Sequence, residues 1–310
     1  MNFFLTKPIV LLLVFLAASG VVFSQKTPQK ELIESGILKA KLGDYTAAIK
    51  DLDRAVALDS TVAESFYNRG LVRTELKDYR GAMLDFSKVI LLKPSLAEPY
   101  YNRGLVKDYL NDYSGAIRDY EKAISFKSDY SEAYHNMGLA RFDLGNYQAA
   151  AQDFSRALQY KPDFAEAYYN RGLSLFNLQD TEGAVRDFNA AIKLDTTQYE
   201  YFSSRGAAKA AGGYYGEAIG DFSIAIAMAP ADTSSRMNLA LALLYLKKYR
   251  EALEEYDRVI EIIPESAEAI ANRGVARQYL ADKQGACEDW KLASQKGSEK
   301  AKTYLLKYCQ

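Results

Sequence analysis

The chain contains a single histidine, His135, and only two cysteines among its 310 residues. A metal site built from several imidazoles or thiolates is therefore excluded. The glycine pair Gly212-Gly213 follows no strand pattern, so it lacks the context of a phosphate-binding loop. Paired carboxylates such as Glu254-Glu255 fall on predicted surface helices, where ion pairing accounts for them. We expect a protein that is not an enzyme and that needs no cofactor.

Neither sign of charge dominates the sequence. The chain has 39 Lys and Arg residues against 40 Asp and Glu residues, which gives a formal net charge of −1. Binding to nucleic acid or to an anionic membrane surface depends on an excess of basic residues. We therefore do not expect nucleic acid as a partner.

A pattern of 34 residues recurs from 29 to 300 without insertion or deletion. Its first marker is a small residue, found at Gly36, Gly70, Gly104, Gly138, Gly172, Gly206, Ala240 and Gly274. Its second marker is an alanine, found at Ala48, Ala82, Ala116, Ala150, Ala184, Ala218, Ala252 and Ala286. In each repeat, two stretches of about a dozen residues flank a Gly, Asn or Asp turn, which predicts an antiparallel pair of helices. Self-similarity at this period indicates a solenoid of such hairpins.

The repeat resembles the tetratricopeptide repeat family over residues 29–300, with repeats that start at 29, 63, 97, 131, 165, 199, 233 and 267. Position 24 carries a large apolar side chain, namely Leu52, Phe86, Tyr120, Phe154, Phe188, Phe222, Tyr256 and Trp290. Proline fills position 32 at Pro94, Pro162, Pro230 and Pro264, whereas the family tyrosine at position 11 is mostly replaced by a basic residue. The resemblance implies an all-α fold, a right-handed α-solenoid of eight helix-turn-helix repeats.

The glycine at position 8 needs a reason, because glycine inside a helix costs about 1 kcal/mol relative to alanine. We expect the two backbones of a hairpin to approach closely there, opposite the alanine at position 20.

The two ends of the chain differ from the repeats. Residues 1–24 have a basic residue, Lys7, an apolar run at 9–18 and small residues before Gln25, as a signal peptide does. We expect cleavage there, a short linker at 25–28 and a periplasmic or extracellular location; an uncleaved anchor in an inner membrane is the alternative. Residues 299–310 predict one amphipathic helix that caps the last repeat.

Position 23 is acidic in every repeat. The second helix of one repeat should run antiparallel to the first helix of the next, so we expect each acid to meet the arginine at position 7 of the next repeat. The predicted pairs are Asp51 with Arg69, Asp85 with Arg103, Asp153 with Arg171, Asp187 with Arg205 and Glu255 with Arg273. The basic residue at position 11 of the same repeat is the competing partner.

The same antiparallel rule applies at the turn into the cap helix. Cys287 and Cys309 each lie eleven residues from Ser298, so the rule places them side by side. We expect a disulfide in an oxidising compartment, with two buried free thiols as the alternative.

In the family that the repeat resembles, the first helices line a concave groove that holds the ligand. The inward positions would then carry aromatic, histidine and asparagine side chains: Tyr67, Asn68, Tyr101, Asn102, Tyr109, His135, Asn136, Phe142, Tyr169, Asn170 and Phe176. Aromatic rings can stack on a ligand, and asparagines offer donors and acceptors to an extended backbone. Packing of the rings between repeats is the alternative. The glutamates at position 2 either face the groove or compensate the helix dipole.

We therefore expect an exported scaffold or adaptor that binds an extended peptide or protein segment. Relatives that grip the carboxylate tails of heat-shock chaperones use a basic clamp, but position 2 is Glu here. This difference favours a neutral or basic segment. A glycan-binding module or an accessory subunit of a periplasmic enzyme complex is the alternative.

Overall fold

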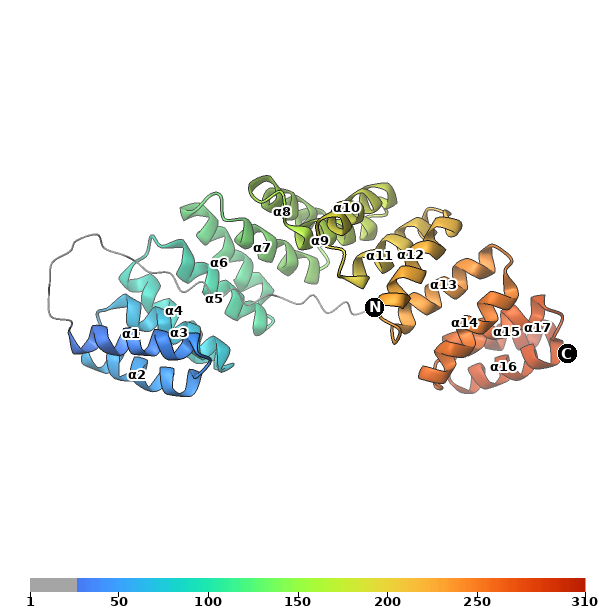
Figure 1. The fold of residues 1–310 in the computed structure, drawn as a ribbon, viewed down its shortest axis with the longest axis horizontal. Coiled ribbons are helices and arrows are strands. Elements are labelled where there is room, and N and C mark those ends of the chain that lie inside the picture. Colours follow the sequence, from blue (N-terminus) through green and yellow to red (C-terminus); the bar gives the residue numbers. More distant parts are fainter. Residues whose placement is uncertain (1–26, 310) are drawn as a thin grey trace. The chain divides into compact units, whose positions relative to one another are not determined.

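The computed structural model describes residues 27–309, so the predicted signal peptide lies outside the described residues. Every regular element in the described range is an α-helix, and consecutive helices form helix-turn-helix pairs (Figure 1). The all-α solenoid fold is confirmed. Seven of the eight first helices begin at the predicted start of their repeat, and the helix of the first repeat begins one residue early, at Pro28.

The chain divides after Pro162 into two units, and each is described by itself. The first unit contains α1 (Pro28–Lys41), α2 (Tyr45–Leu58), α3 (Ala63–Glu75), α4 (Tyr79–Leu92), α5 (Ala97–Tyr109), α6 (Tyr113–Phe126), α7 (Ser131–Asp143) and α8 (Tyr147–Tyr160). The second unit contains α9 (Ala165–Asn177), α10 (Thr181–Leu194), α11 (Tyr199–Ala211), α12 (Tyr215–Met228), α13 (Thr233–Tyr245), α14 (Tyr249–Ile262), α15 (Ala267–Tyr279), α16 (Lys283–Gln295) and the cap helix α17 (Glu299–Tyr308).

The turn inside each hairpin has the same backbone conformation in all eight repeats. Its position 15 has a φ between 60° and 84°, at Gly43, Lys77, Asn111, Gly145, Gln179, Gly213, Lys247 and Ala281. The next residue is the N-cap of the second helix, and in six repeats its side-chain oxygen accepts a hydrogen bond from the backbone N–H three residues later. The two exceptions are Tyr214 and Lys248, which make no such bond.

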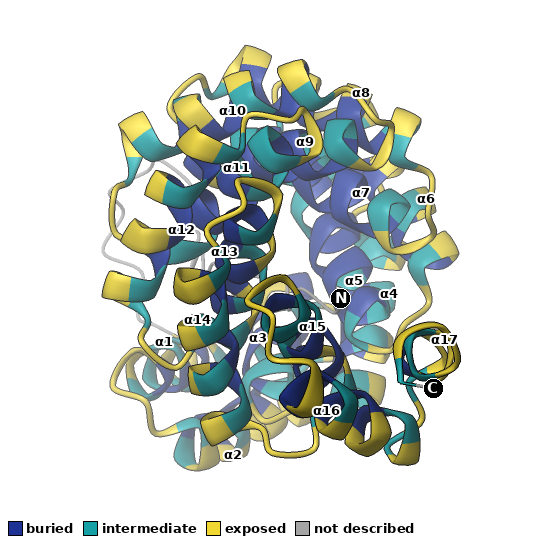
Figure 2. Cartoon of the chain, turned by 90° about the vertical axis from the view of Figure 1, so that its right-hand side faces the viewer, coloured by how far each residue is buried: buried dark blue, intermediate teal, exposed yellow. Residues whose placement is uncertain are grey.

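The large side chain at position 24 forms the centre of each hairpin. All eight of these side chains are at most 1 % exposed. A Cβ built on Gly138 would lie 2.8 Å from the ring of Phe154, and the glycines of six other repeats face their own position 24 at 2.6–2.9 Å. The glycine therefore leaves the space that the side chain at position 24 occupies. The alanines at position 20, which we expected opposite the glycine, are fully buried. Figure 2 shows these buried faces inside the hairpins and the exposed residues at the turns.

The predicted pairing between repeats was wrong, because the arginine at position 7 binds the acid of its own repeat. Arg69 donates to both carboxylate oxygens of Asp85, at 3.0 and 2.7 Å, and its third nitrogen reaches Asp53 of the preceding repeat at 2.9 Å. The same two-bond contact joins Arg103 to Asp119, Arg171 to Asp187, Arg205 to Asp221 and Arg273 to Asp289. Positions 7 and 23 are equidistant from the turn within the repeat, where the two helices pack most closely. The basic residue at position 11 adds a second cation, as Arg73 does to Asp85 at 2.8 Å.

Repeat 4 departs from this arrangement, because Met137 stands where the arginine would be. Asp153 keeps only Arg141, which donates to both of its oxygens at 2.8 Å. Burial outweighs the opposing effect of this single arginine, and the nearby Glu121 adds to it, so the pKa of Asp153 rises to about 7. Asp119 and Asp221, for which no partner in the next repeat was predicted, are bound by Arg103 and Arg205 of their own repeats.

The cap helix α17 covers the end of the last hairpin. Ala301 is fully buried, and the ring of Tyr304 lies 5.1 Å from that of Trp290. A disulfide joins Cys287 to Cys309, whose Cα atoms are 5.8 Å apart. In the chain-entropy account, closing a loop of this length contributes about 3 kcal/mol to the free energy of unfolding.

Two helical glycines of repeat 6 test whether the glycine at position 8 is needed to make room for the buried side chain at position 24. Replacing Gly206 with Ala would place a Cβ 2.8 Å from Phe222, whereas a Cβ on Gly220 would meet nothing within 4 Å. We expect Gly206→Ala to lower the free energy of unfolding by about 1–3 kcal/mol through overpacking. Gly220→Ala should raise it by up to about 1 kcal/mol through helix propensity. Urea unfolding of both variants measures the difference, and equal effects would contradict the role given to Gly206.

Candidate functional site

All eight predicted groove residues of the first unit lie on α3, α5 and α7, but five of them are more buried than a ligand-binding row should be. Tyr101 is 5 % exposed and His135 is 4 % exposed. The ring of Tyr101 packs against those of Tyr120 and Tyr130, at centroid distances of 5.9 and 4.8 Å. The ring of His135 lies 5.5 Å from that of Phe154. These side chains therefore hold neighbouring helices together, which is the packing alternative.

The asparagines form a ladder with the tyrosines of the preceding repeat. The Nδ2 of Asn102 donates to the hydroxyl of Tyr67 at 3.0 Å and to the backbone carbonyl of Glu98 at 3.0 Å. The Nδ2 of Asn136 donates to the hydroxyl of Tyr101 at 2.9 Å. These amide donors are thus used within the fold and are not available to a ligand backbone.

The remaining predicted residues are distributed between core and surface. In the second unit, Tyr169 and Asn170 are 8 % and 5 % exposed, and the ring of Tyr169 lies 4.7 Å from that of Tyr201. Phe142 and Phe176 are half-buried, and Phe142 packs edge-on against Tyr147 with centroids 5.0 Å apart. Tyr109 is half-buried and its ring stacks on that of Tyr79. Asn68 donates to the carbonyl of Glu64 at 2.9 Å.

Tyr67 is the predicted residue that best combines a structural role with access to ligand. Its hydroxyl accepts the bond from Asn102, so its own proton remains available to donate. Burial, and secondly the charge of Glu98, raise the pKa of Tyr67 to about 12. The phenol is therefore protonated, and a hydrogen-bond donor, at every physiological pH.

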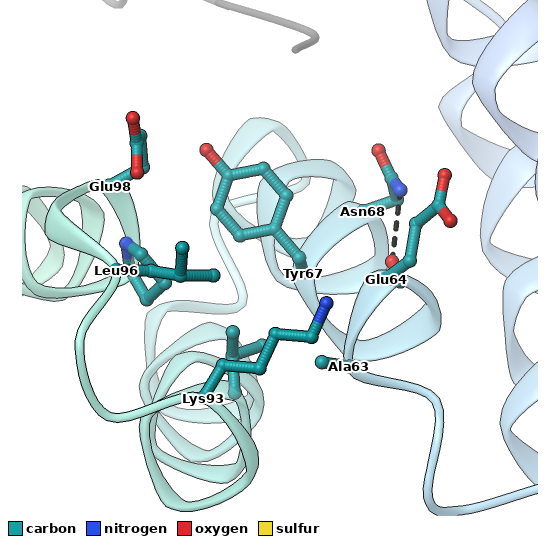
Figure 3. Close-up of a pocket in the computed structure, with 9 residues that line it drawn as sticks. Ala63, Glu64, Tyr67, Asn68, Lys93, Leu96 and Glu98 are labelled. Carbon is teal, nitrogen blue, oxygen red and sulfur yellow. Dashed lines mark hydrogen bonds between the residues drawn. The ribbon is translucent and has the colours of Figure 1, made fainter. Parts of the chain in front are cut away.

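Tyr67 forms one wall of a pocket between α3, the end of α4 and the start of α5 (Figure 3). The pocket has a volume of about 130 Å³. Its lining is mostly apolar and includes four small or branched residues: Ala63, Val89, Leu96 and Pro99. A cavity of this order, if apolar, is large enough for a small ring or a branched aliphatic side chain.

Three charged side chains stand around the pocket: Glu64, Glu98 and Lys93 (Figure 3). Within residues 27–309, none of the three has an ion-pair partner within 4.0 Å. Glu64 and Glu98 lie in the first turns of α3 and α5, where their charge also stabilises the helix N-terminus. The arrangement offers an apolar floor with acceptors and a cation at the rim, which suits a peptide side chain and the backbone next to it.

The sequence predicted Tyr67 and Asn68 and offered Glu64 and Glu98, at position 2, as possible groove residues. It did not predict the other lining residues, Ala63, Val89, Lys93, Leu96 and Pro99. Val89 comes from the second helix of the repeat, Lys93 is the C-cap of that helix, and Leu96 comes from the link to the next repeat. One signal was present in the sequence. Position 31 is lysine in three consecutive repeats of the first unit, at Lys93, Lys127 and Lys161.

The described residues contain neither a candidate metal site nor a candidate membrane span. From 27 to 309, no group of three His, Cys, Asp or Glu side chains is placed to hold a metal ion. Over the same range, no helix has the length and the apolar character needed to span a bilayer.

The ladder can be tested at Tyr101. Tyr101→Phe removes the acceptor of the buried Asn136 amide, so we expect the free energy of unfolding to fall by about 1–3 kcal/mol. The control Tyr134→Phe should have little effect, because that hydroxyl has no hydrogen-bond partner among the described residues. Urea unfolding gives both values. The double variant Tyr101→Phe/Asn136→Leu should recover part of the lost stability. An unchanged stability of Tyr101→Phe would contradict a stabilising role for the hydrogen bond between Asn136 and Tyr101.

Comparisons with known proteins agree with the repeat. Family models described as TPR repeat or tetratricopeptide repeat match residues 38–77, 63–96, 109–145, 138–179, 165–197 and 205–267. No curated protein matches the chain.

Solved structures with the same fold cover much of the chain. The C-terminal part of a TPR repeat-containing protein from Cytophaga hutchinsonii is 18 % identical, with a TM-score of 0.64, over 77 % of this chain and 98 % of that one. A tetratricopeptide repeat protein from Parabacteroides merdae is 17 % identical, with a TM-score of 0.58, over 82 % and 98 %. YrrB, described as a TPR protein with an unusual peptide-binding site, is 25 % identical, with a TM-score of 0.55, over 60 % and 95 %.

Proposed function

We propose, from the premise that the chain belongs to the tetratricopeptide repeat family, that it is a non-catalytic scaffold which binds an extended protein segment on the first helices of its first unit. Family membership supports a role in protein interaction. The observation that carries the finer proposal is the pocket between α3 and α5, which has an apolar floor and unpaired charges at its rim. The peptide-binding site named for YrrB also supports it.

The segment would enter the pocket with one apolar side chain. The hydroxyl of Tyr67 and the ammonium of Lys93 are donors for its backbone carbonyls, and the carboxylate of Glu98 is an acceptor for its backbone N–H groups. A peptide is favoured over a glycan, because Tyr101 and Tyr169 bury the ring faces on which a sugar would stack.

Peptides selected from a random library on residues 25–310 test this assignment. We expect Lys93→Glu and Glu98→Lys each to weaken a selected peptide by about tenfold, which corresponds to about 1.4 kcal/mol. Both side chains lie at the surface of the pocket, so the melting temperature should stay close to that of the wild type. Fluorescence anisotropy of the labelled peptide gives the affinities.

Arg118→Glu is the matched control, because Arg118 is an exposed cation on the second helix α6. It should leave the affinity unchanged. If the pocket variants and the control behave alike, the peptide binds elsewhere and the assignment fails. A library that yields no binding peptide would contradict the peptide-binding function itself.

We also propose that the protein acts after export, in a periplasm or outside the cell. The pattern of residues 1–24 and the pairing of Cys287 with Cys309 both support this location. Intact mass measurement of the protein recovered from the periplasm of an expressing bacterium should give a chain that begins at Gln25 and carries no free thiol. A full-length mass, or alkylation of both cysteines without reduction, would contradict the proposal.

A further inference from the structure

Five tyrosines occupy the turns of the hairpins in repeats 6–8 of the second unit. These residues, which we call the tyrosine ridge, are Tyr214, Tyr215, Tyr245, Tyr249 and Tyr279. Tyr215 stacks on Tyr245 with centroids 4.5 Å apart and planes 7° apart. Tyr249 stacks on Tyr279 with centroids 4.5 Å apart and planes 5° apart. Each stack joins one hairpin to the next, the first from α12 to α13 and the second from α14 to α15.

Three residues of the tyrosine ridge are exposed to solvent, whereas Tyr215 and Tyr249 are partly buried. Tyr214, Tyr245 and Tyr279 are 60 %, 59 % and 64 % exposed. Contiguous exposed aromatic surface is uncommon on soluble proteins and marks sites of interaction. Tyrosine suits such a site, because it offers a large contact area and has few torsions to immobilise.

Unpaired basic residues lie beside the ridge. The turn of repeat 7, residues 245–251, contains three basic residues and one acidic residue. The other two turns of the ridge, 211–217 and 279–285, together contain one basic residue and two acidic residues. Lys248 pairs with Glu251 at 3.1 Å, but both side chains are about half exposed, so the pair contributes little. Within the described range, Lys247, Arg250 and Lys283 have no ion-pair partner. The excess of positive charge therefore lies at the turn of repeat 7.

The equivalent turns of the first unit differ in charge but not in stacking. Tyr79 and Tyr109 stack there with centroids 5.1 Å apart, at the same two repeat positions. The segments 75–81 and 109–115 contain two basic residues and three acidic residues. The stacked rings are therefore a feature of the repeat, whereas the positive charge and the greater exposure belong to the second unit.

Lys248, like Tyr214, departs from the pattern at the N-cap of the second helix. Six of the eight repeats have Asp or Asn at this position, where the side chain caps the second helix, and such a cap stabilises a helix by about 1 kcal/mol. Lys248 makes no cap bond. A local departure that lowers stability is expected where a residue serves a function.

We propose that the tyrosine ridge, together with Lys247, Lys248 and Arg250, is a docking surface for an acidic segment of a partner protein. Carboxylates of the segment pair with the three cations, and its apolar or aromatic side chains lie on the exposed tyrosines. The surface goes beyond the groove function of the first unit and does not depend on it. A nucleic acid fits less well, because an excess of two charges neutralises too few phosphates for useful affinity.

The probe is a fluorescein-labelled peptide of alternating Glu and Phe residues, measured by fluorescence anisotropy against residues 25–310. We expect salt-sensitive binding that Arg250→Glu weakens by about tenfold, because the change replaces an attraction with a repulsion. Arg80→Glu is the matched control, since Arg80 is exposed and occupies the same position in repeat 2. It should leave the affinity unchanged.

Lys248→Asp separates binding from folding. The new side chain restores the helix cap, so the melting temperature should rise while the affinity for the peptide falls by about tenfold. The proposal is overturned if the peptide does not bind, or if Arg80→Glu weakens it as much as Arg250→Glu does. It is also overturned if Lys248→Asp binds normally, or if a single-stranded oligonucleotide competes more tightly than the peptide.

Discussion

The contact between the side chain at position 24 and the glycine at position 8 determines the geometry of each hairpin. Seven repeats place a glycine against a large buried side chain, so close that a single added methyl group would have to displace it. Repeat 7 has Ala240 opposite Tyr256, which shows that the contact can be adjusted in one place. Because each hairpin leaves an apolar face uncovered, this contact also sets the surface on which the next repeat packs.

That packing explains why the aromatic and asparagine rows are mostly unavailable to a ligand. Tyr101 fills the space between neighbouring first helices, and Asn136 uses its amide to bind the tyrosine hydroxyl. A side chain with this double contact links the stability of two repeats. The surfaces that we propose for recognition consist of residues that the packing of the repeats does not use, such as Lys93 at the rim of the pocket and Arg250 beside the tyrosine ridge.

The charged residues divide in the same way into those that pair inside the fold and those that lie at the surface. The arginine at position 7 makes two bonds to a buried aspartate of its own hairpin, so its charge is neutralised inside the fold. Its third nitrogen then reaches the preceding repeat, as Arg69 does with Asp53. Among residues 27–309, some charges at the turns and at the starts of the first helices, such as Arg250 and Glu98, have no ion-pair partner, and we propose these for partner binding.

The repeat length, the helices and their boundaries could be predicted from the sequence, because periodic glycine, alanine and turn residues specify local backbone conformation. The juxtaposition of Cys287 and Cys309 could also be predicted, since it needs only the distance along the chain from one turn. The partners of the position 23 acids could not, because positions 7 of the same repeat and of the next repeat both satisfy the antiparallel rule. Only the tertiary packing decides which of the two arginines lies closer. For the same reason the sequence identified Tyr67 but not the pocket, which requires Val89, Lys93 and Leu96 to be brought together from separate elements.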